Sequence, residues 1–116
     1  MRHESVAQVL HAANAALCSA HGDNSHAPWS EIGDDARSHF VRMAVRVSAS
    51  PMAGAEEMHD FWMNDHLERG WSWGPLKDRE AKKHPCLVPF AELSDLEKAK
   101  DALVVAIVRA LLPKGK

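Results

Sequence analysis

The chain has 116 residues, of which 46% are apolar and 26% are charged, and its formal net charge is −2. This length and composition are typical of one globular domain with a single hydrophobic core. The near-neutral charge excludes a general nucleic-acid binder, which would carry a clear excess of lysine and arginine.

The first part of the chain contains signals for two helices. Ser5 opens a capping box, and apolar residues then recur at helical spacing as far as Ala20. Gly22 is the predicted stop, since glycine favours the position just after a helix. The same periodicity predicts a second helix over about residues 34–47. Pro51 is expected to break it, because proline disfavours helical geometry in the residue before it.

The second part begins with a predicted helix over residues 55–69, which Gly70 ends. An irregular loop over residues 70–89 follows and contains several Gly and Pro residues. One short helical turn is expected in this loop near residues 76–82. The loop also holds two of the four tryptophans of the chain, so we call it the tryptophan loop.

The last predicted helix has the clearest start and the widest apolar face. Ser94 and Glu97 have the spacing of a capping box, and Pro113 is the expected stop. Between them the apolar residues cover a wider arc than a surface helix normally shows. This helix therefore either lies at the centre of the core or forms half of an oligomer contact.

An internal repeat relates the two parts. His11 precedes Gly22 by the same interval that separates His59 from Gly70, and segment 27–32 aligns with segment 88–93. A capped helix follows in each part. The sequence thus predicts a mainly α single domain over residues 1–116. It would consist of two helix–loop–helix pseudo-repeats, a degenerate one over 4–48 and a second one over 55–112, with the tryptophan loop inserted only in the second.

The tryptophans of the second half have two alternative roles. Large rings in a loop either anchor it to a core or offer stacking faces to a ligand. Trp71 directly follows a helix-ending glycine, which favours an anchor. For Trp73 the sequence favours neither role. Trp62 on the preceding helix is either a core residue or a stacking platform.

Three ordered motifs resemble the RyR domain, the repeat module of ryanodine receptors. They are the segments His59-Asp60-Phe61-Trp62, Gly70-Trp71-Ser72-Trp73-Gly74-Pro75-Leu76-Lys77-Asp78 and Lys83-His84-Pro85-Cys86-Leu87-Val88-Pro89-Phe90. The likeness covers about residues 56–112. The first half resembles the companion segment of stand-alone RyR-domain proteins from bacteria and phages. The resemblance implies a mainly helical fold with small extended pieces, in which paired repeats form a cleft.

The resemblance also implies a ligand. Paired RyR repeats of the receptors are regarded as sites where a purine nucleotide lodges against an aromatic ring with basic neighbours. Carried over by motif, Trp62 would stack on the purine, Lys77 with Asp78 beside it would face the phosphate, and His84 would be a polar neighbour. Trp73 and Asn14 complete the implied ligand set, Asn14 because it pairs with Trp62 in the repeat. Trp71 and His59 are the implied structural anchors.

Catalysis and metal binding find little support in the pattern. His59 and His66 share a helical face, but no third metal ligand follows from spacing. Cys18 and Cys86 match no metal spacing either, and we expect free thiols in preference to a disulfide. His84 lies too close to Cys86 along an extended segment to form a nucleophile–base pair. We therefore expect a non-enzymatic protein with no metal and no cofactor.

Two functions from different classes remain. The preferred one is a binding module for a purine-nucleotide-like small molecule, acting as a sensor or a sequestering protein. The alternative is a protein–protein interaction or structural module, with contact to a second copy or another protein through the C-terminal helix. No apolar run is long enough for a membrane span, and the N-terminal segment lacks an apolar signal core, so we expect a cytoplasmic protein without nucleic-acid or membrane partners. The discriminating observation is whether Trp62 and Lys77 face a common accessible site.

Overall fold

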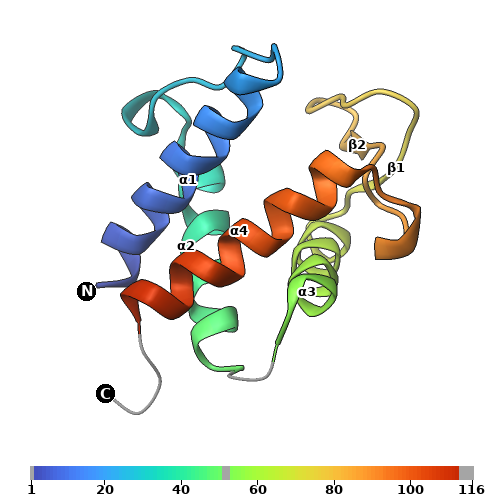
Figure 1. Ribbon diagram of the computed structural model, residues 1–116. Helices are drawn as coiled ribbons and strands as arrows, with labels where there is room; N and C mark the ends of the chain where they lie inside the picture. The colour runs from blue at the N-terminus through green and yellow to red at the C-terminus, as the bar shows by residue number, and fades with distance from the viewer. Residues whose placement is uncertain (1, 51–52, 113–116) are drawn as a thin grey trace.

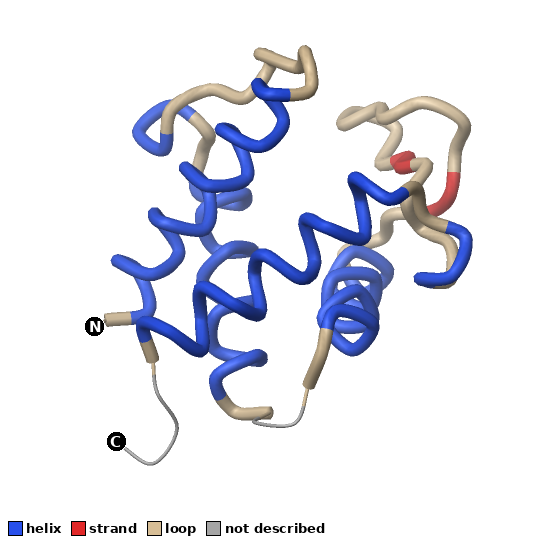
Figure 2. The backbone as a smooth tube through the Cα atoms, viewed as in Figure 1, coloured by secondary structure: helices blue, strands red, loops and turns tan. Residues whose placement is uncertain are grey.

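The computed structural model describes residues 2–50 and 53–112, so the predicted breaks at Pro51 and Pro113 lie outside the described residues. The fold is mainly helical, as predicted (Figures 1 and 2). The helices are α1 (His3–Ala20), α2 (Asp34–Ser48), α3 (Ala55–Glu68) and α4 (Asp95–Leu111). Shorter elements are the 3₁₀ turns η1 (Trp29–Glu31) and η2 (Phe90–Glu92) and the strands β1 (Ser72–Trp73) and β2 (Lys83–His84). None of the described helices is both long and apolar enough to cross a membrane.

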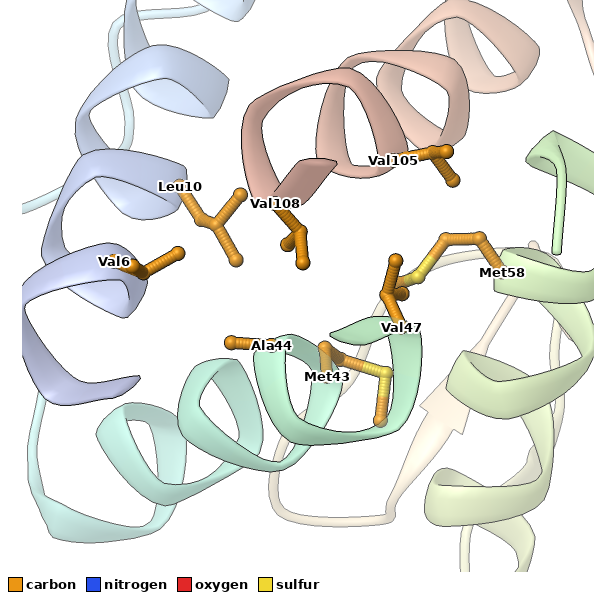
Figure 3. Packing of buried hydrophobic residues seen from close by; sticks show 8 residues of the cluster. All are labelled: Val6, Leu10, Met43, Ala44, Val47, Met58, Val105 and Val108. Carbon is orange, nitrogen blue, oxygen red and sulfur yellow. The ribbon is translucent and has the colours of Figure 1, made fainter. Parts of the chain in front are cut away.

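α4 lies at the centre of the fold. It packs against each of the other three helices, and Val105 and Val108 are buried where they meet. Figure 3 shows side chains from all four helices converging on this region: Val6, Leu10, Met43, Ala44, Val47, Met58, Val105 and Val108. Val104, Ile107 and Leu111 pack on the same cluster. The wide apolar arc of α4 is therefore explained by contact with helices on several sides.

The helix starts match the sequence signals at one of the two capping boxes. Ser94 caps α4, because its hydroxyl oxygen accepts a hydrogen bond from the Glu97 N–H at 3.2 Å. The prediction at Ser5 is wrong. α1 already begins at His3, where the Val6 N–H donates to the carbonyl of Arg2 at 3.1 Å. Ser5 thus lies inside the first turn and its hydroxyl is not needed as a cap.

Both predicted glycine stops are confirmed. Gly22 and Gly70 have φ angles of 91° and 89°, in the left-handed region that favours glycine. Each closes a Schellman motif, in which the N–H of the following residue donates back to the last turn. The Trp71 N–H reaches the His66 carbonyl at 3.0 Å, and the Asp23 N–H reaches the Cys18 carbonyl at 2.9 Å. The chain therefore reverses at the same point in each half.

The aligned histidines make the same contact in the two halves. His11 Nε2 donates to the carbonyl of Ala27 at 2.7 Å, and His59 Nε2 donates to the carbonyl of Val88 at 2.7 Å. Each acceptor immediately precedes the proline that introduces a 3₁₀ turn, η1 or η2. The two parts of the chain thus share one long-range hydrogen bond at positions that align in the sequence.

The tryptophan loop contains short extended pieces, as expected. β1 and β2 pair in parallel, with Ser72 opposite Lys83 and Trp73 opposite His84. The expected helical turn near residues 76–82 is wrong. Asp78 and Lys83 instead form an antiparallel bridge with N–H to carbonyl distances of 2.9 Å in both directions. Lys82 takes a left-handed φ of 56° between them, which closes a tight turn in place of a helix.

Candidate functional site

Trp62 lies in a group of aromatic and histidine rings. Its indole is stacked on His59, with ring centroids 5.5 Å apart and planes at 17°. His66, one turn further along α3, approaches to 4.2 Å, and His84 of β2 meets the indole edge-on at 4.9 Å. Trp71 contacts His66 at 5.1 Å. Trp62 is half-buried, so it packs against the fold and also retains an accessible part.

Two of these histidines are neutral at pH 7. Burial lowers the pKa of His66 to about 3. Burial, and after it the charge of Lys77, lowers the pKa of His84 to about 4. His84 Nδ1 accepts a hydrogen bond from the Cys86 N–H at 3.0 Å, so the imidazole also holds the turn at Pro85. The cluster around Trp62 is therefore aromatic and polar, but these two members carry no charge.

Lys77 brings positive charge to the same region. The residue is exposed, yet enough protein surrounds its amine for burial to lower the lysine pKa. The neighbouring positive charges of Arg79 and Lys100 lower that pKa further. Lys77 and Lys100 also lower the pKa of His26 in the loop after α1, although burial is the larger cause there. The positive charges of the tryptophan loop and α4 thus lower the pKa values of basic groups in the loop and in the first half.

Acidic and thiol groups of α4 and the loop complete this polar region. Burial and the charge of Glu97 raise the pKa of Asp101 to about 7. The same two causes raise the pKa of Cys86 to about 12, so its thiol stays protonated and is a poor nucleophile. Lys100 Nζ lies 3.1 Å from a carboxylate oxygen of Glu97. A bound anion would therefore meet lysines whose charge is only partly balanced by carboxylates.

The structure brings some of the predicted ligand residues together. His84 connects them, because its ring contacts Trp62 while Lys77 shifts its pKa. Trp73 is 55% exposed and pairs with His84 through the β1–β2 backbone. Asp78 has a structural role in the loop, where its carboxylate accepts the Ala81 N–H at 3.1 Å.

The remaining predicted residues are His59, Trp71 and Asn14. His59 is 2% exposed and anchors segment 88–93 through Val88, and Trp71 is half-buried against His66. Asn14 lies on α1 and is half-buried. Within residues 2–50 and 53–112, no hydrogen bond joins Asn14 to the other candidates.

A separate pocket of about 310 Å³ lies between α2 and α3. Its walls include Phe61, with the Arg46 guanidinium 5.2 Å from the ring centroid. Asp65 at its edge binds Arg42 and Arg69 at distances of 2.7 and 3.2 Å, and it also faces His39 Nδ1 at 2.7 Å. Burial alone would raise the pKa of Asp65, but the hydrogen bonds from His39 and Arg42 outweigh it and hold the pKa well below the usual value. None of the predicted ligand residues lines this pocket.

Sequence reasoning missed several members of the polar region. Lys100, Asp101 and His26 come from α4 and from the first half, far from the motif segments in the sequence. The first two lie on the predicted last helix, to which the sequence analysis assigned no ligand residue. No local pattern distinguishes a lysine that faces another segment from one that faces water.

At each of two places in the structure, three side chains of metal-binding type lie close together. One group is Cys18, Asp23 and His26, and the other is His39, Asp65 and His66.

The fold and the site together define a small helical module made of two similar helix–loop–helix halves. A family model for the RyR domain matches residues 39–115. The match starts within α2 and covers α3, the tryptophan loop and α4. Because it spans more than half of the chain, this protein belongs to the RyR domain family.

Proposed function

We propose that this protein is a non-enzymatic binding module for a purine-nucleotide-like small molecule and acts as a sensor or a sequestering protein. The observation that carries the proposal is the position of His84, which contacts the Trp62 ring while its pKa responds to the charge of Lys77. An aromatic surface and a cationic group thus flank one side chain. This combination suits a ligand with a flat base and a phosphate.

Electrostatics supports an anionic ligand. Lys77 has a lowered pKa, in part because Lys100 and Arg79 repel its charge. A phosphate placed among these groups would relieve the repulsion and favour the charged lysines. Lysine supplies a mobile point charge, which suits a phosphate without fixing its orientation. Binding should therefore weaken as salt concentration rises.

The aromatic part supplies the base contact. Stacking of a base on an aromatic side chain contributes roughly 1–3 kcal/mol. His59 and His66 already contact the Trp62 ring, so the base would use the part of the indole that remains accessible. A single partly covered ring predicts modest affinity. We expect discrimination to come more from the phosphate than from the base.

The direct test is isothermal titration calorimetry against adenine and guanine nucleotides and cyclic dinucleotides, with thermal-shift measurements alongside. Lys77→Gln should weaken binding about tenfold, as expected for loss of one ion pair of about 1–2 kcal/mol. Trp62→Leu should weaken it to a similar extent. Lys98→Gln is the matched control, because Lys98 lies over the Phe90 ring on the same helix as Lys100 and has the same charge.

The outcome separates binding from mere charge attraction. Equal loss in Lys77→Gln and Lys98→Gln would indicate nonspecific electrostatics and contradict the proposal. No heat and no thermal shift with any of these nucleotides at millimolar concentration would also contradict it, because a ligand at about 100 times its Kd stabilises the folded state by about 2.7 kcal/mol.

A protein–protein interaction module is the second candidate. Trp73 and Leu76, three residues apart in the tryptophan loop, are 55% and 78% exposed. Exposed large apolar side chains in one loop are typical of contact surfaces. Sedimentation velocity over a range of concentrations would detect self-association, and Trp73→Ser with Leu76→Ser should abolish it. The C-terminal helix is a weaker contact candidate, since its apolar arc packs on the core.

A further inference from the structure

The end of α1 brings three side chains of metal-binding type together. Cys18 lies in the last turn of the helix, and Asp23 and His26 lie in the loop that follows. The cysteine Sγ, a carboxylate oxygen and an imidazole nitrogen are all within 4.8 Å of one another. The Schellman motif at Gly22 produces this arrangement, because it reverses the chain and returns Asp23 to the last turn of α1.

Local hydrogen bonds orient the carboxylate. Asp23 Oδ1 accepts from the Ser25 N–H at 3.0 Å and from the Ser25 hydroxyl at 2.6 Å. The other oxygen, Oδ2, faces His26 Nε2 at 3.6 Å. One carboxylate oxygen is thus held by the loop, while the second points toward the imidazole. Such outer hydrogen bonds are the usual means by which proteins position metal ligands.

The end of α1 also favours a cation at this place. The carbonyl end of α1 adds partial negative charge, which favours a cation near its last turn.

Lys100 is the main group that opposes a metal ion here. Burial lowers the pKa of Lys100, but hydrogen bonds with Glu97 and Cys18 raise it more. The ion pair that Lys100 forms with Glu97 at 3.1 Å involves none of the three metal-type side chains. Lys100 therefore competes with the metal ion without blocking the carboxylate or the imidazole.

The second cluster of metal-type side chains provides a contrast. His39, Asp65 and His66 also lie within 4.8 Å of one another. Both oxygens of Asp65 are taken, since Arg42 and Arg69 bind them with His39. Two guanidinium charges on one carboxylate repel a further cation. This cluster is an ion-pair network, whereas Asp23 has no arginine or lysine partner among the described ion pairs.

We propose that Cys18, Asp23 and His26 form a binding site for a divalent transition-metal ion of the zinc class. Thiolate, imidazole and carboxylate together favour Zn²⁺ over the hard ions Mg²⁺ and Ca²⁺. On binding, the Cys18 S–H bond breaks, a sulfur–metal bond forms and the proton passes to solvent. Three protein ligands leave one position of a tetrahedral ion for water or an anion. The site uses no residue of the predicted ligand set, so it goes beyond the proposed function.

The test is titration of the reduced full-length chain with Co²⁺, followed by competition with Zn²⁺. A tetrahedral Co²⁺ site with one thiolate should give intense visible bands and a near-ultraviolet sulfur-to-cobalt charge-transfer band at one ion per chain. Cys18→Ser should remove the charge-transfer band. Asp23→Asn and His26→Gln should each weaken binding on the order of 100-fold, since loss of an outer-shell partner alone costs 10–100-fold.

Matched controls use side chains of the same chemistry outside the cluster. Cys86→Ser removes the other thiol, and His21→Gln removes an exposed histidine of the same loop whose Nδ1 contacts the Leu17 carbonyl. Both variants should bind Co²⁺ as the wild type does. Lys100→Met should bind Co²⁺ more tightly, because it removes the competing charge.

Several results would overturn the proposal. Absence of stoichiometric binding to the wild type would do so, as would a charge-transfer band that persists in Cys18→Ser. Cys18 is only 1% exposed, so this variant can fail to fold. In that case Asp23→Asn and His26→Gln decide, and wild-type affinity in both would refute the site. Trp62→Leu, which is expected to weaken nucleotide binding, should leave Co²⁺ binding unchanged, which keeps this test independent of nucleotide binding.

Discussion

His59 Nδ1 lies 3.6 Å from a carboxylate oxygen of Asp101, and the two side chains are only 2% and 13% exposed. His59 Nε2 donates to the Val88 carbonyl, so Nδ1 is the ring nitrogen that faces the carboxyl group. The raised pKa of Asp101, about 7, keeps a proton on that carboxyl in weakly acidic solution. In the first half the matching nitrogen, His11 Nδ1, is buried without a hydrogen-bond partner among the described residues.

The stability of the protein should decrease as the pH falls from 6.5 to about 4.5. In this window the unfolded chain protonates His66 and His84, whereas the folded chain does not, because their folded pKa values are about 3 and about 4. Asp101 acts in the opposite direction, since its carboxyl is protonated in the folded chain and largely ionised in the unfolded one. The unfolded state thus binds more protons overall, and the free energy of unfolding rises with pH.

Urea denaturation at several pH values between 4.5 and 6.5 checks this sign. His84→Gln should make the dependence shallower, and Asp101→Asn should make it steeper. His21→Gln serves as the control, because His21 is exposed and lies outside the cluster. A free energy of unfolding that stays flat in all four proteins would show that these pKa shifts are absent.

Among the carboxylates near the surface, Asp65 should cause the largest loss in the free energy of unfolding when it is replaced. It receives hydrogen bonds from His39, Arg42 and Arg69 and so joins α2 to the end of α3. Asp65→Asn would leave these donors without their negative partner, at a cost of roughly 2–4 kcal/mol in the free energy of unfolding. Asp60→Asn is the control, since Asp60 is exposed on the same helix and should change stability by less than about 0.5 kcal/mol. Similar values for the two variants would argue against this role of Asp65.

Trp71 and Trp73 should differ in their effect on folding. Trp71 is half-buried, with its ring against His66 and near His84, so Trp71→Ala should cost roughly 2–3 kcal/mol. Trp73 is 55% exposed, and Trp73→Ala should cost less than about 1 kcal/mol. Chemical denaturation of the two variants measures both values. Equal losses would mean that the loop is not anchored through Trp71 alone.

Substitution of two glycines in the tryptophan loop should destabilise the protein, for a different reason at each position. Gly70→Ala forces a side chain into a φ of 89°, at a cost of about 1–2 kcal/mol. Gly74→Ala would place a Cβ atom 2.7 Å from Lys83 Cβ, so β1 and β2 would have to separate. Gly54→Ala is the milder control, because its new Cβ would meet only the end of one side chain, the Glu57 carboxylate, at 3.3 Å. Thermal melts should rank Gly54→Ala as the least destabilised variant.

The sequence predicted those features that depend on a few neighbouring residues. Ser94 caps α4, and Gly22 and Gly70 end α1 and α3, because capping and left-handed turns are local properties of the chain. The prediction failed at Ser5, because the helix cap is Arg2, three residues further back. It also failed near residues 76–82, where an Asp78–Lys83 bridge replaces a helical turn. Both errors arise where more than one local structure can provide hydrogen-bond partners for the same backbone N–H and carbonyl groups.

The candidate site was only partly accessible to sequence reasoning. Motif likeness led to Trp62, Lys77 and His84. The fold places the His84 ring 4.9 Å from Trp62, and the charge of Lys77 contributes, after burial, to the lowered pKa of His84. The contribution of Lys100 could not be foreseen, because an isolated lysine on a helix gives no signal of the segment it faces. The ion-pair network at Asp65 was missed for the same reason, since His39 and Arg42 lie on a different helix.

By itself, the sequence determined the helical character, the helix stops and the likeness between the two halves, since periodicity, caps and glycines act over one or two turns. Only the tertiary structure decided that α4 is central, that His59 faces Asp101 and that Lys77 and Lys100 share a region. These relationships depend on how four helices pack. Packing is governed by the combined fit of many side chains, so no short segment of the chain encodes it.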